Sequence, residues 1–143
     1  MTLQLWGRPS SARTQKVMLA LSELNLTYEF IKASATMGPK GSVSRGKTPY
    51  GIVDTKEYLE KNPNGTIPTI NDAGFVLWES NAIVQYLGMK YNPKLFYDAN
   101  IETFASASRW MMWENNQLIP PMHDLAKHLY RLPENQRDEN VVR

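Results

Sequence analysis

Two serines lie where the first predicted helix of the chain begins, and they are the first candidates for chemistry. Ser10 and Ser11 belong to the turn 7–13, between an apolar run and a helical pattern. The N-terminus of a helix presents free N–H groups and a partial positive charge, which stabilise a bound anion such as a thiolate. A hydroxyl there can donate a hydrogen bond to the thiolate and lower its pKa. The alternative is that one of these serines is simply the helix N-cap.

A proline at the start of a predicted strand, in the step Ile67–Pro68, is the second candidate. Proline cannot donate to a strand ladder, so it belongs at a strand end or an edge. A cis bond would turn the backbone of Ile67 outward, where a peptide-like ligand could pair with it as an added strand. We predict this cis bond, and a trans proline at the sheet edge is the alternative.

A carboxylic acid and a hydroxyl, Glu79 and Ser80, precede the next predicted helix. The Ser80 hydroxyl and the free N–H groups of the helix end could bind a carboxylate. The alternative is that Ser80 only caps the helix.

The segment 34–51 contains four glycines and the basic residues Lys40, Arg45 and Lys47 without one acidic residue. It predicts a long surface loop. Its charges either contact an anionic ligand or are simply solvated.

Apolar periodicity predicts the elements that position these residues. Strands are expected at 2–6, 28–31, 66–70 and 75–79, and helices at 13–24, at 55–61 behind a capping pair of Asp54 and Glu57, and from Ser80 to 91. The order is βαβ, then α, then ββα, which predicts an α/β fold with one parallel strand pair. All the candidate residues fall at connections that should converge at one end of the sheet.

The remainder of the chain has only helical patterns. Residues 94–100 are expected to be a linker, followed by a long helix at 101–118 that Pro120 and Pro121 should break. A second helix is expected from Met122 and a third from Pro133. So few helices cannot bury all their apolar stripes, so we expect the chain to be a truncated protein or a fragment. The predicted boundaries are a domain at 1–90, a linker at 91–100 and a partial helical domain at 101–143.

Composition excludes several kinds of chemistry. The 143 residues include 16 Lys and Arg against 14 Asp and Glu, and the net charge of +2 does not favour nucleic acid as a partner. The absence of cysteine excludes disulfides, thiolate-bound zinc and cysteine nucleophiles, so any thiol chemistry needs a substrate thiol. The sequence contains neither an apolar run of membrane-spanning length nor a signal peptide pattern, so no membrane association and a cytoplasmic location are expected.

Several stretches together resemble the glutathione S-transferase family, particularly bacterial members with a serine in the active-site loop. The matching stretches are residues 6–11 and 15–17, 57–59 and 62–68, 78–83, and 109–113, the last being similar to the opening of the family's all-α domain. The resemblance implies a thioredoxin-like N-terminal domain followed by the start of an all-α helical domain. It also implies glutathione as co-substrate, no metal, a homodimer and a role in detoxification.

The same resemblance implies roles for individual residues. Ser11 matches the thiol-activating hydroxyl, with Ser10 as the second choice. Ile67, beside a cis Pro68, would pair with the cysteinyl part of glutathione. The other glutathione-binding candidates are Glu79 and Ser80 for the γ-glutamyl group, Arg13, which stands where bacterial relatives often have Asn, and Asn64.

Two further expectations concern the rest of the ligand set. The pair Gly65–Thr66 lacks the basic residue that commonly helps to bind the glycyl carboxylate, so a cation of the 34–51 loop is expected to replace it. The pocket for a hydrophobic electrophile would include Trp110, Met112 and Trp113, unless these residues are plain core. The expected reaction is attack of the glutathione thiolate on an electrophilic carbon. A non-catalytic binding or scaffold protein of the same fold is the alternative.

Overall fold

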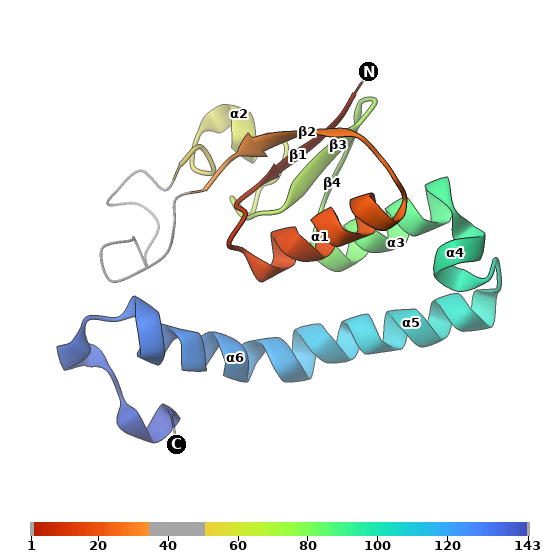
Figure 1. The fold of residues 1–143 in the computed structure, drawn as a ribbon. Helices are drawn as coiled ribbons and strands as arrows, with labels where there is room; N and C mark the ends of the chain where they lie inside the picture. Colours follow the sequence, from red (N-terminus) through yellow and green to blue (C-terminus); the bar gives the residue numbers. More distant parts are fainter. Residues whose placement is uncertain (1, 35–50, 143) are drawn as a thin grey trace.

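The computed structural model describes residues 2–34 and 51–142, and its centre is a four-stranded sheet with the order β2-β1-β3-β4 (Figure 1). The strands are β1 (Leu3–Gly7), β2 (Tyr28–Lys32), β3 (Thr69–Asp72) and β4 (Phe75–Trp78). β1 and β2 are parallel and β3 is antiparallel to both β1 and β4. Helix α1 (Ala12–Glu23) makes the crossover that a parallel pair requires. The predicted α/β order is therefore confirmed.

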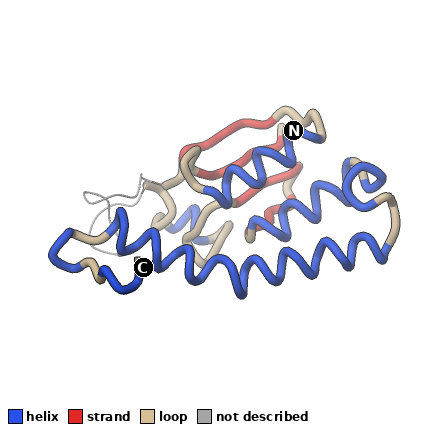
Figure 2. The backbone as a smooth tube through the Cα atoms, turned by 60° about the horizontal axis from the view of Figure 1, so that its bottom comes forward, coloured by secondary structure: helices blue, strands red, loops and turns tan. Residues whose placement is uncertain are grey.

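The two faces of the sheet carry separate apolar clusters, because side chains alternate along β1. Leu5 points to the main core, which α1 and α3 (Ser80–Tyr91) complete. The next residue, Trp6, points to a smaller cluster that contains Tyr58 of α2 (Lys56–Leu59). α1 and α3 thus lie between the sheet and the long helical segment that follows (Figures 1 and 2).

Two predicted boundaries differ from the structure. β3 begins at Thr69 and not at residue 66, since Pro68 has no N–H to donate to the ladder. The capping pair expected from Asp54 is wrong by one residue: the Thr55 side chain caps α2 by accepting a hydrogen bond from the Tyr58 N–H at 3.3 Å.

The segment expected to be a linker contains a helix, α4 (Pro93–Tyr97). Asn92 caps it by accepting from the Leu95 N–H at 3.0 Å, and Pro93 occupies the first helical position. α4 packs closely on α3: a side chain at Gly88 would come within 2.8 Å of the Phe96 ring. The pair Asn92–Pro93 thus both ends α3 and starts α4.

The remaining residues form one continuous helical segment followed by two short turns (Figure 2). The elements are α5 (Ile101–Trp113), the π-helical η1 (Glu114–Leu118), α6 (Ile119–Ala126), the π-helical η2 (Lys127–Arg131), and the 3₁₀ turns η3 (Glu134–Gln136) and η4 (Glu139–Val141). The break expected at Pro120 and Pro121 is wrong. After the π-helical turn the prolines fall in the first turn of α6, where a missing N–H is tolerated best.

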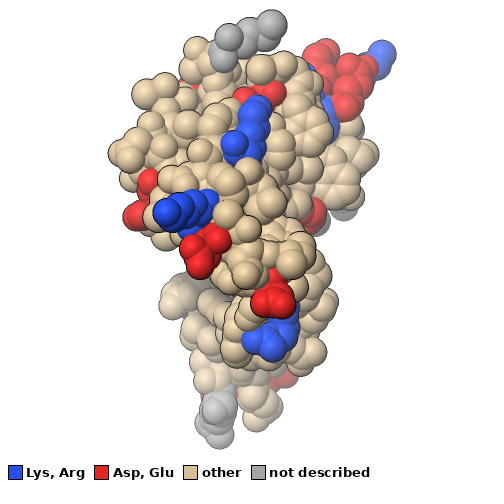
Figure 3. Space-filling model, turned by 90° about the vertical axis from the view of Figure 1, so that its right-hand side faces the viewer, with Lys and Arg blue, Asp and Glu red and all other residues tan. Residues whose placement is uncertain are grey.

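Acidic and basic side chains lie beside one another on the end of the molecule drawn in Figure 3, and no patch of one sign covers that face. This agrees with the near balance of charge in the sequence. In the described ranges we find no helix with the length and apolar character that a membrane crossing requires.

Candidate functional site

The first candidate, Ser11, is the N-cap of α1. Its Oγ accepts a hydrogen bond from the Thr14 N–H at 3.4 Å, and the side chain is half-buried, whereas Ser10 is exposed. Of the two serines, it is therefore Ser11 that caps the helix. Capping uses an acceptor lone pair and not the hydroxyl proton, so the same O–H can still donate to a bound anion.

Thr14 of α1 holds the turn that contains Ser11. Thr14 is fully buried, and its Oγ1 accepts from the Arg8 N–H at 3.4 Å. A Cβ atom at Gly7 would collide with the methyl group of the buried Thr14, which favours glycine there. We did not predict a role for Thr14, because a threonine inside an apolar helical stripe gives no separate signal.

A buried polar cluster fixes the segment before Pro68. Asn62 is fully buried and donates from Nδ2 to the Thr66 carbonyl at 2.9 Å and to the Thr69 Oγ1 at 3.0 Å. The Tyr58 hydroxyl donates to the same Thr66 carbonyl at 2.6 Å. Burial raises the pKa of Tyr58, and its hydrogen bonds with Thr69 and Asn62 offset part of that rise. Tyr58 therefore stays protonated and available as a donor.

The Ile67–Pro68 peptide bond is cis, as predicted. Ile67 is half-buried and Pro68 is buried at the entry to β3. The candidate Asn64 lies in the preceding turn, where its side chain is exposed and its N–H donates to the Asn62 Oδ1 at 3.1 Å. The residue types of this turn predict it, but they do not predict that the Asn62 side chain, which organises it, is buried.

The last pair of candidates stands at the start of α3, and the expectation that Ser80 caps this helix is wrong. Ser80 is not the cap: it is the first helical residue and is buried, with 4 % of its surface exposed. Glu79 takes the N-cap position with φ 72° and ψ 112°, a backbone conformation that non-glycine residues rarely adopt. Such outliers cluster at functional sites, which makes this junction a site candidate in its own right.

The strand register brings these features to one edge of the sheet. Trp6 pairs with Thr69, and Thr69 pairs with Trp78. These three paired residues form a row across the sheet. Beyond this row β1 and β4 run in the same direction, toward Ser11 and Glu79, and the chain enters β3 from that side through Pro68. The predicted convergence is therefore confirmed for Ser11, Ile67–Pro68 and Glu79–Ser80. The expected contribution of Lys40, Arg45 and Lys47 lies outside the described residues.

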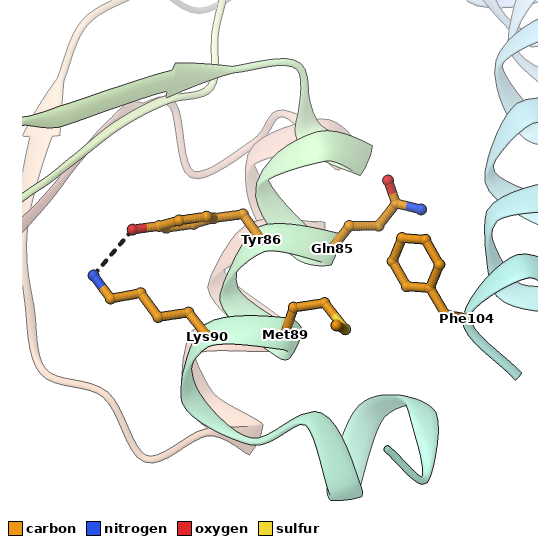
Figure 4. A pocket seen from close by; sticks show the side chains of 5 residues that line it. All are labelled: Gln85, Tyr86, Met89, Lys90 and Phe104. Carbon is orange, nitrogen blue, oxygen red and sulfur yellow. Dashed lines mark hydrogen bonds between the residues drawn. The ribbon is translucent and has the colours of Figure 1, made fainter. Parts of the chain in front are cut away.

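The α5 residues expected to line the electrophile pocket are surface residues and not core. Trp110, Met112 and Trp113 are 60 %, 52 % and 48 % exposed, and the two indole rings meet edge to face with their centroids 5.9 Å apart. An apolar hollow of about 390 Å³ lies elsewhere, between α3 and α5 (Figure 4). It is lined by Gln85, Tyr86, Met89, Lys90 and Phe104.

The model of the family "Glutathione S-transferase, N-terminal domain" matches residues 5–95 of the chain. The chain belongs to the glutathione S-transferase family. Glutathione S-transferase GstB of Escherichia coli strain K12 is 34 % identical over 142 residues, 98 % of this chain and 62 % of that protein. A probable glutathione S-transferase of rice, GSTF2, is 27 % identical over 86 % of this chain and 51 % of its own.

A solved structure of the same family shares the fold across nearly the whole chain. It is the theta class glutathione S-transferase of Xanthomonas axonopodis pv. citri with glutathione bound, with a TM-score of 0.81 and 34 % identity. The match covers 99 % of this chain and 62 % of that chain, so the present chain spans less than two thirds of the relatives it matches. The predicted thioredoxin-like domain followed by helices is thereby confirmed.

Proposed function

We propose that this protein is a glutathione transferase, which joins the glutathione thiolate to an electrophilic carbon of an apolar substrate. The supporting observation is the convergence of Ser11, Ile67 and the Glu79–Ser80 junction at one sheet edge, in a chain of the glutathione S-transferase family. The similar Xanthomonas protein has been solved with glutathione bound.

Glutathione would lie along the edge as an extended peptide. The N-terminus of α3, with Ser80 in its first position, suits the γ-glutamyl carboxylate, and the Glu79 carboxylate suits the γ-glutamyl amine. The backbone of Ile67 would pair with the cysteinyl residue. Arg13, in the first turn of α1, and Asn64, in the turn before Pro68, are the remaining proposed contacts of glutathione. The cations Lys40, Arg45 and Lys47 remain the proposed partners of the glycyl carboxylate.

The chemical step depends on the thiolate. A free thiol has a pKa near about 8.5, so little of it is ionised at neutral pH. A hydrogen bond from Ser11 to the sulfur contributes about 1.5–3 kcal/mol, which corresponds to a pKa lower by about one to two units. The thiol proton passes to solvent, and the sulfur electron pair forms the bond to carbon while the leaving group departs with its own pair. This scheme uses no metal or redox cofactor.

The apolar substrate would contact the exposed side chains of α5. Trp110, Met112 and Trp113 offer a large apolar surface. A homodimer in the cytoplasm with a role in detoxification completes the proposal.

Glutathione calorimetry combined with a conjugation assay on Ser11→Ala tests the proposal. Removing the hydroxyl should raise the pKa of bound glutathione and slow conjugation at neutral pH about tenfold to a hundredfold, while affinity stays near that of the wild type. Ser11→Thr keeps a hydroxyl and should restore the rate. Ser10→Ala is the matched control, because Ser10 lies outside α1 and is exposed.

Each other outcome has a definite meaning. Binding without turnover in the wild-type protein would support the non-catalytic binding protein and contradict the transferase. Normal conjugation by Ser11→Ala with impaired Ser10→Ala would move the activating role by one residue. Normal conjugation by both would assign it to the helix end or to Arg13.

A further inference from the structure

A polar cluster joins three helical segments next to the proposed glutathione site, and Lys16 of α1 is its centre. Lys16 Nζ donates to the Asn81 Oδ1 of α3 at 2.6 Å and to both carboxylate oxygens of Glu114 at 2.7 Å. Asn81 Nδ2 in turn donates to Glu114 Oε2 and to the Met111 carbonyl, both at 2.9 Å. All three side chains are therefore held by one another in a single geometry.

The cluster contains a partly buried ion pair. The Lys16 and Glu114 side chains are 28 % and 22 % exposed, and Asn81 is buried. Burial alone would raise the pKa of Glu114, but hydrogen bonds from Lys16 and Asn81, with the charges of Lys16 and Arg13, hold it below its ordinary value. Partly buried ion pairs add little net stability, because desolvation offsets their attraction. Their best-attested effect is to fix one arrangement among several.

The arrangement fixed here includes the two helix ends proposed to hold glutathione. Lys16 follows Ser11 by five residues, which is about 7.5 Å along a helix axis. Asn81 directly follows Ser80. The Lys16–Asn81 bond thus ties α1, which Ser11 caps, to α3, which begins at Ser80. In the proposed complex, the glutathione thiol lies at the N-terminal end of α1 and the γ-glutamyl group at the N-terminal end of α3. Any change in the separation of these two helix ends would therefore move the thiol relative to the Ser11 hydroxyl.

Glu114 brings the third segment to this tie. It is the first residue of the π-helical turn η1, directly after α5. π-helical turns within α-helices are frequent at functional sites. Through Glu114, the helical part of the chain contacts the two helices that begin at the proposed site.

We infer that Glu114 is a positioning residue for glutathione: through Lys16 and Asn81 it sets the separation of Ser11 from Ser80 and so aligns the glutathione sulfur with the Ser11 hydroxyl. This inference rests on the proposed function. It assigns Glu114 no contact with the substrate.

Glu114→Gln, which keeps the size of the side chain but removes the charge, tests the inference. The quantities to measure are the ultraviolet absorbance of the bound thiolate and the conjugation rate, over a pH range that spans the thiol pKa. The expected result is a raised pKa of bound glutathione and conjugation about tenfold slower at neutral pH, with the rate recovering at high pH. The figure of ten is modest beside the roughly hundredfold loss that a misplacement of 1 Å can cause.

Lys90→Met is the matched control. Lys90 pairs with Asp72 at 2.7 Å, the same distance as Lys16 and Glu114, but in the last turn of α3, away from Ser11 and Ser80. It should lower thermal stability and leave the thiol pKa unchanged. Lys16→Met breaks the Glu114 pair from the other side and should reproduce the Glu114→Gln profile.

Two results would overturn the inference alone, and a third would overturn it together with the proposed function. A wild-type thiol pKa in Glu114→Gln, with only thermal stability lowered, would make the cluster merely structural. Failure of both Glu114→Gln and Lys16→Met to fold would lead to the same conclusion. If the wild-type protein itself binds no glutathione, the proposed function fails, and the inference fails with it.

Discussion

The α/β part of the molecule and the helical segment beyond it bury their apolar side chains to very different degrees. Leu5, Leu21, Ile70, Ile83 and Leu87 are fully buried in and around the sheet. In the segment from α5 to η2 no residue is buried, although its apolar pattern predicts helices equally well. Periodicity thus identifies a helix but not what covers it. The free energy of folding should reside mainly in the α/β part.

Equivalent truncations in the two parts should break this comparison most clearly. Ile70→Ala removes a fully buried side chain from β3 and should lower the free energy of unfolding by about 2–5 kcal/mol, through lost burial and the cavity left behind. Ile101→Ala makes the same chemical change at a side chain that is 76 % exposed, and should change it by about 0.5 kcal/mol or less. Urea denaturation followed by circular dichroism measures both.

The two isoleucine variants also test how independent the parts are. If Ile101→Ala destabilises the protein as strongly as Ile70→Ala, the N-terminal end of α5 is covered in solution, and the two parts do not differ in burial at this position.

A second prediction concerns the ion pair that lies within the α/β part. Asp72 is 6 % exposed and accepts hydrogen bonds from Lys90 at 2.7 Å, from Tyr86 at 2.9 Å and from Tyr91 at 2.8 Å. Burial by itself raises the pKa of Asp72, but these bonds outweigh it and lower the pKa below 3.8. Asp72→Asn should lower the free energy of unfolding at pH 7 by about 1.5–3 kcal/mol.

The stability that Asp72 contributes should decrease as the pH falls. A carboxyl whose pKa is lower in the folded than in the unfolded state stabilises the fold above the unfolded value, and the contribution is lost as the pH falls through the folded value. The difference between wild type and Asp72→Asn should therefore be constant near neutral pH and shrink below about pH 4. Chemical denaturation at stepped pH measures it. A difference that persists at low pH would mean that Asp72 acts through packing and not through its charge.

Much of the fold was predictable because short stretches of the sequence carry the patterns of individual strands, helices and turns. β1, α1 and the β3–β4 hairpin follow from alternation, helical spacing and turn residues. α4 was missed because five residues are too few for a period to be recognised, although its Asn-Pro start is a helix signal in its own right. Pro120 and Pro121 predicted a helix break that the structure does not have. The rule that proline ends a helix does not foresee the π-helical turn η1, which places both prolines in the first turn of α6.

The candidate site divides in the same way. Ser11, Ile67–Pro68 and Glu79–Ser80 were predicted because each lies at a chain connection with a distinctive residue type. Asn62 and Thr14 were missed because a sequence does not show that these polar side chains are buried, although their partners are only four to seven residues away. Glu114 was missed because its partner Lys16 is 98 residues away. A single sequence does not indicate which distant polar residues meet in the fold.

The smallest predicted effect has the opposite sign and lies where the two parts of the molecule meet. Tyr97 of α4 packs edge to face against Phe104 of α5 at 5.1 Å, and within residues 2–34 and 51–142 its buried hydroxyl has no hydrogen-bond partner. Burial raises the pKa of Tyr97, so the group stays protonated, and a buried donor without a partner destabilises the fold. Tyr97→Phe should therefore raise the free energy of unfolding by about 1 kcal/mol. Tyr91→Phe is the control, since the Tyr91 hydroxyl donates to Asp72, and it should lower the same quantity by a similar amount. Urea denaturation of both variants decides between them: a loss of stability in Tyr97→Phe would mean that the hydroxyl is hydrogen-bonded in solution, and that the junction is held by a polar contact as well as by packed rings.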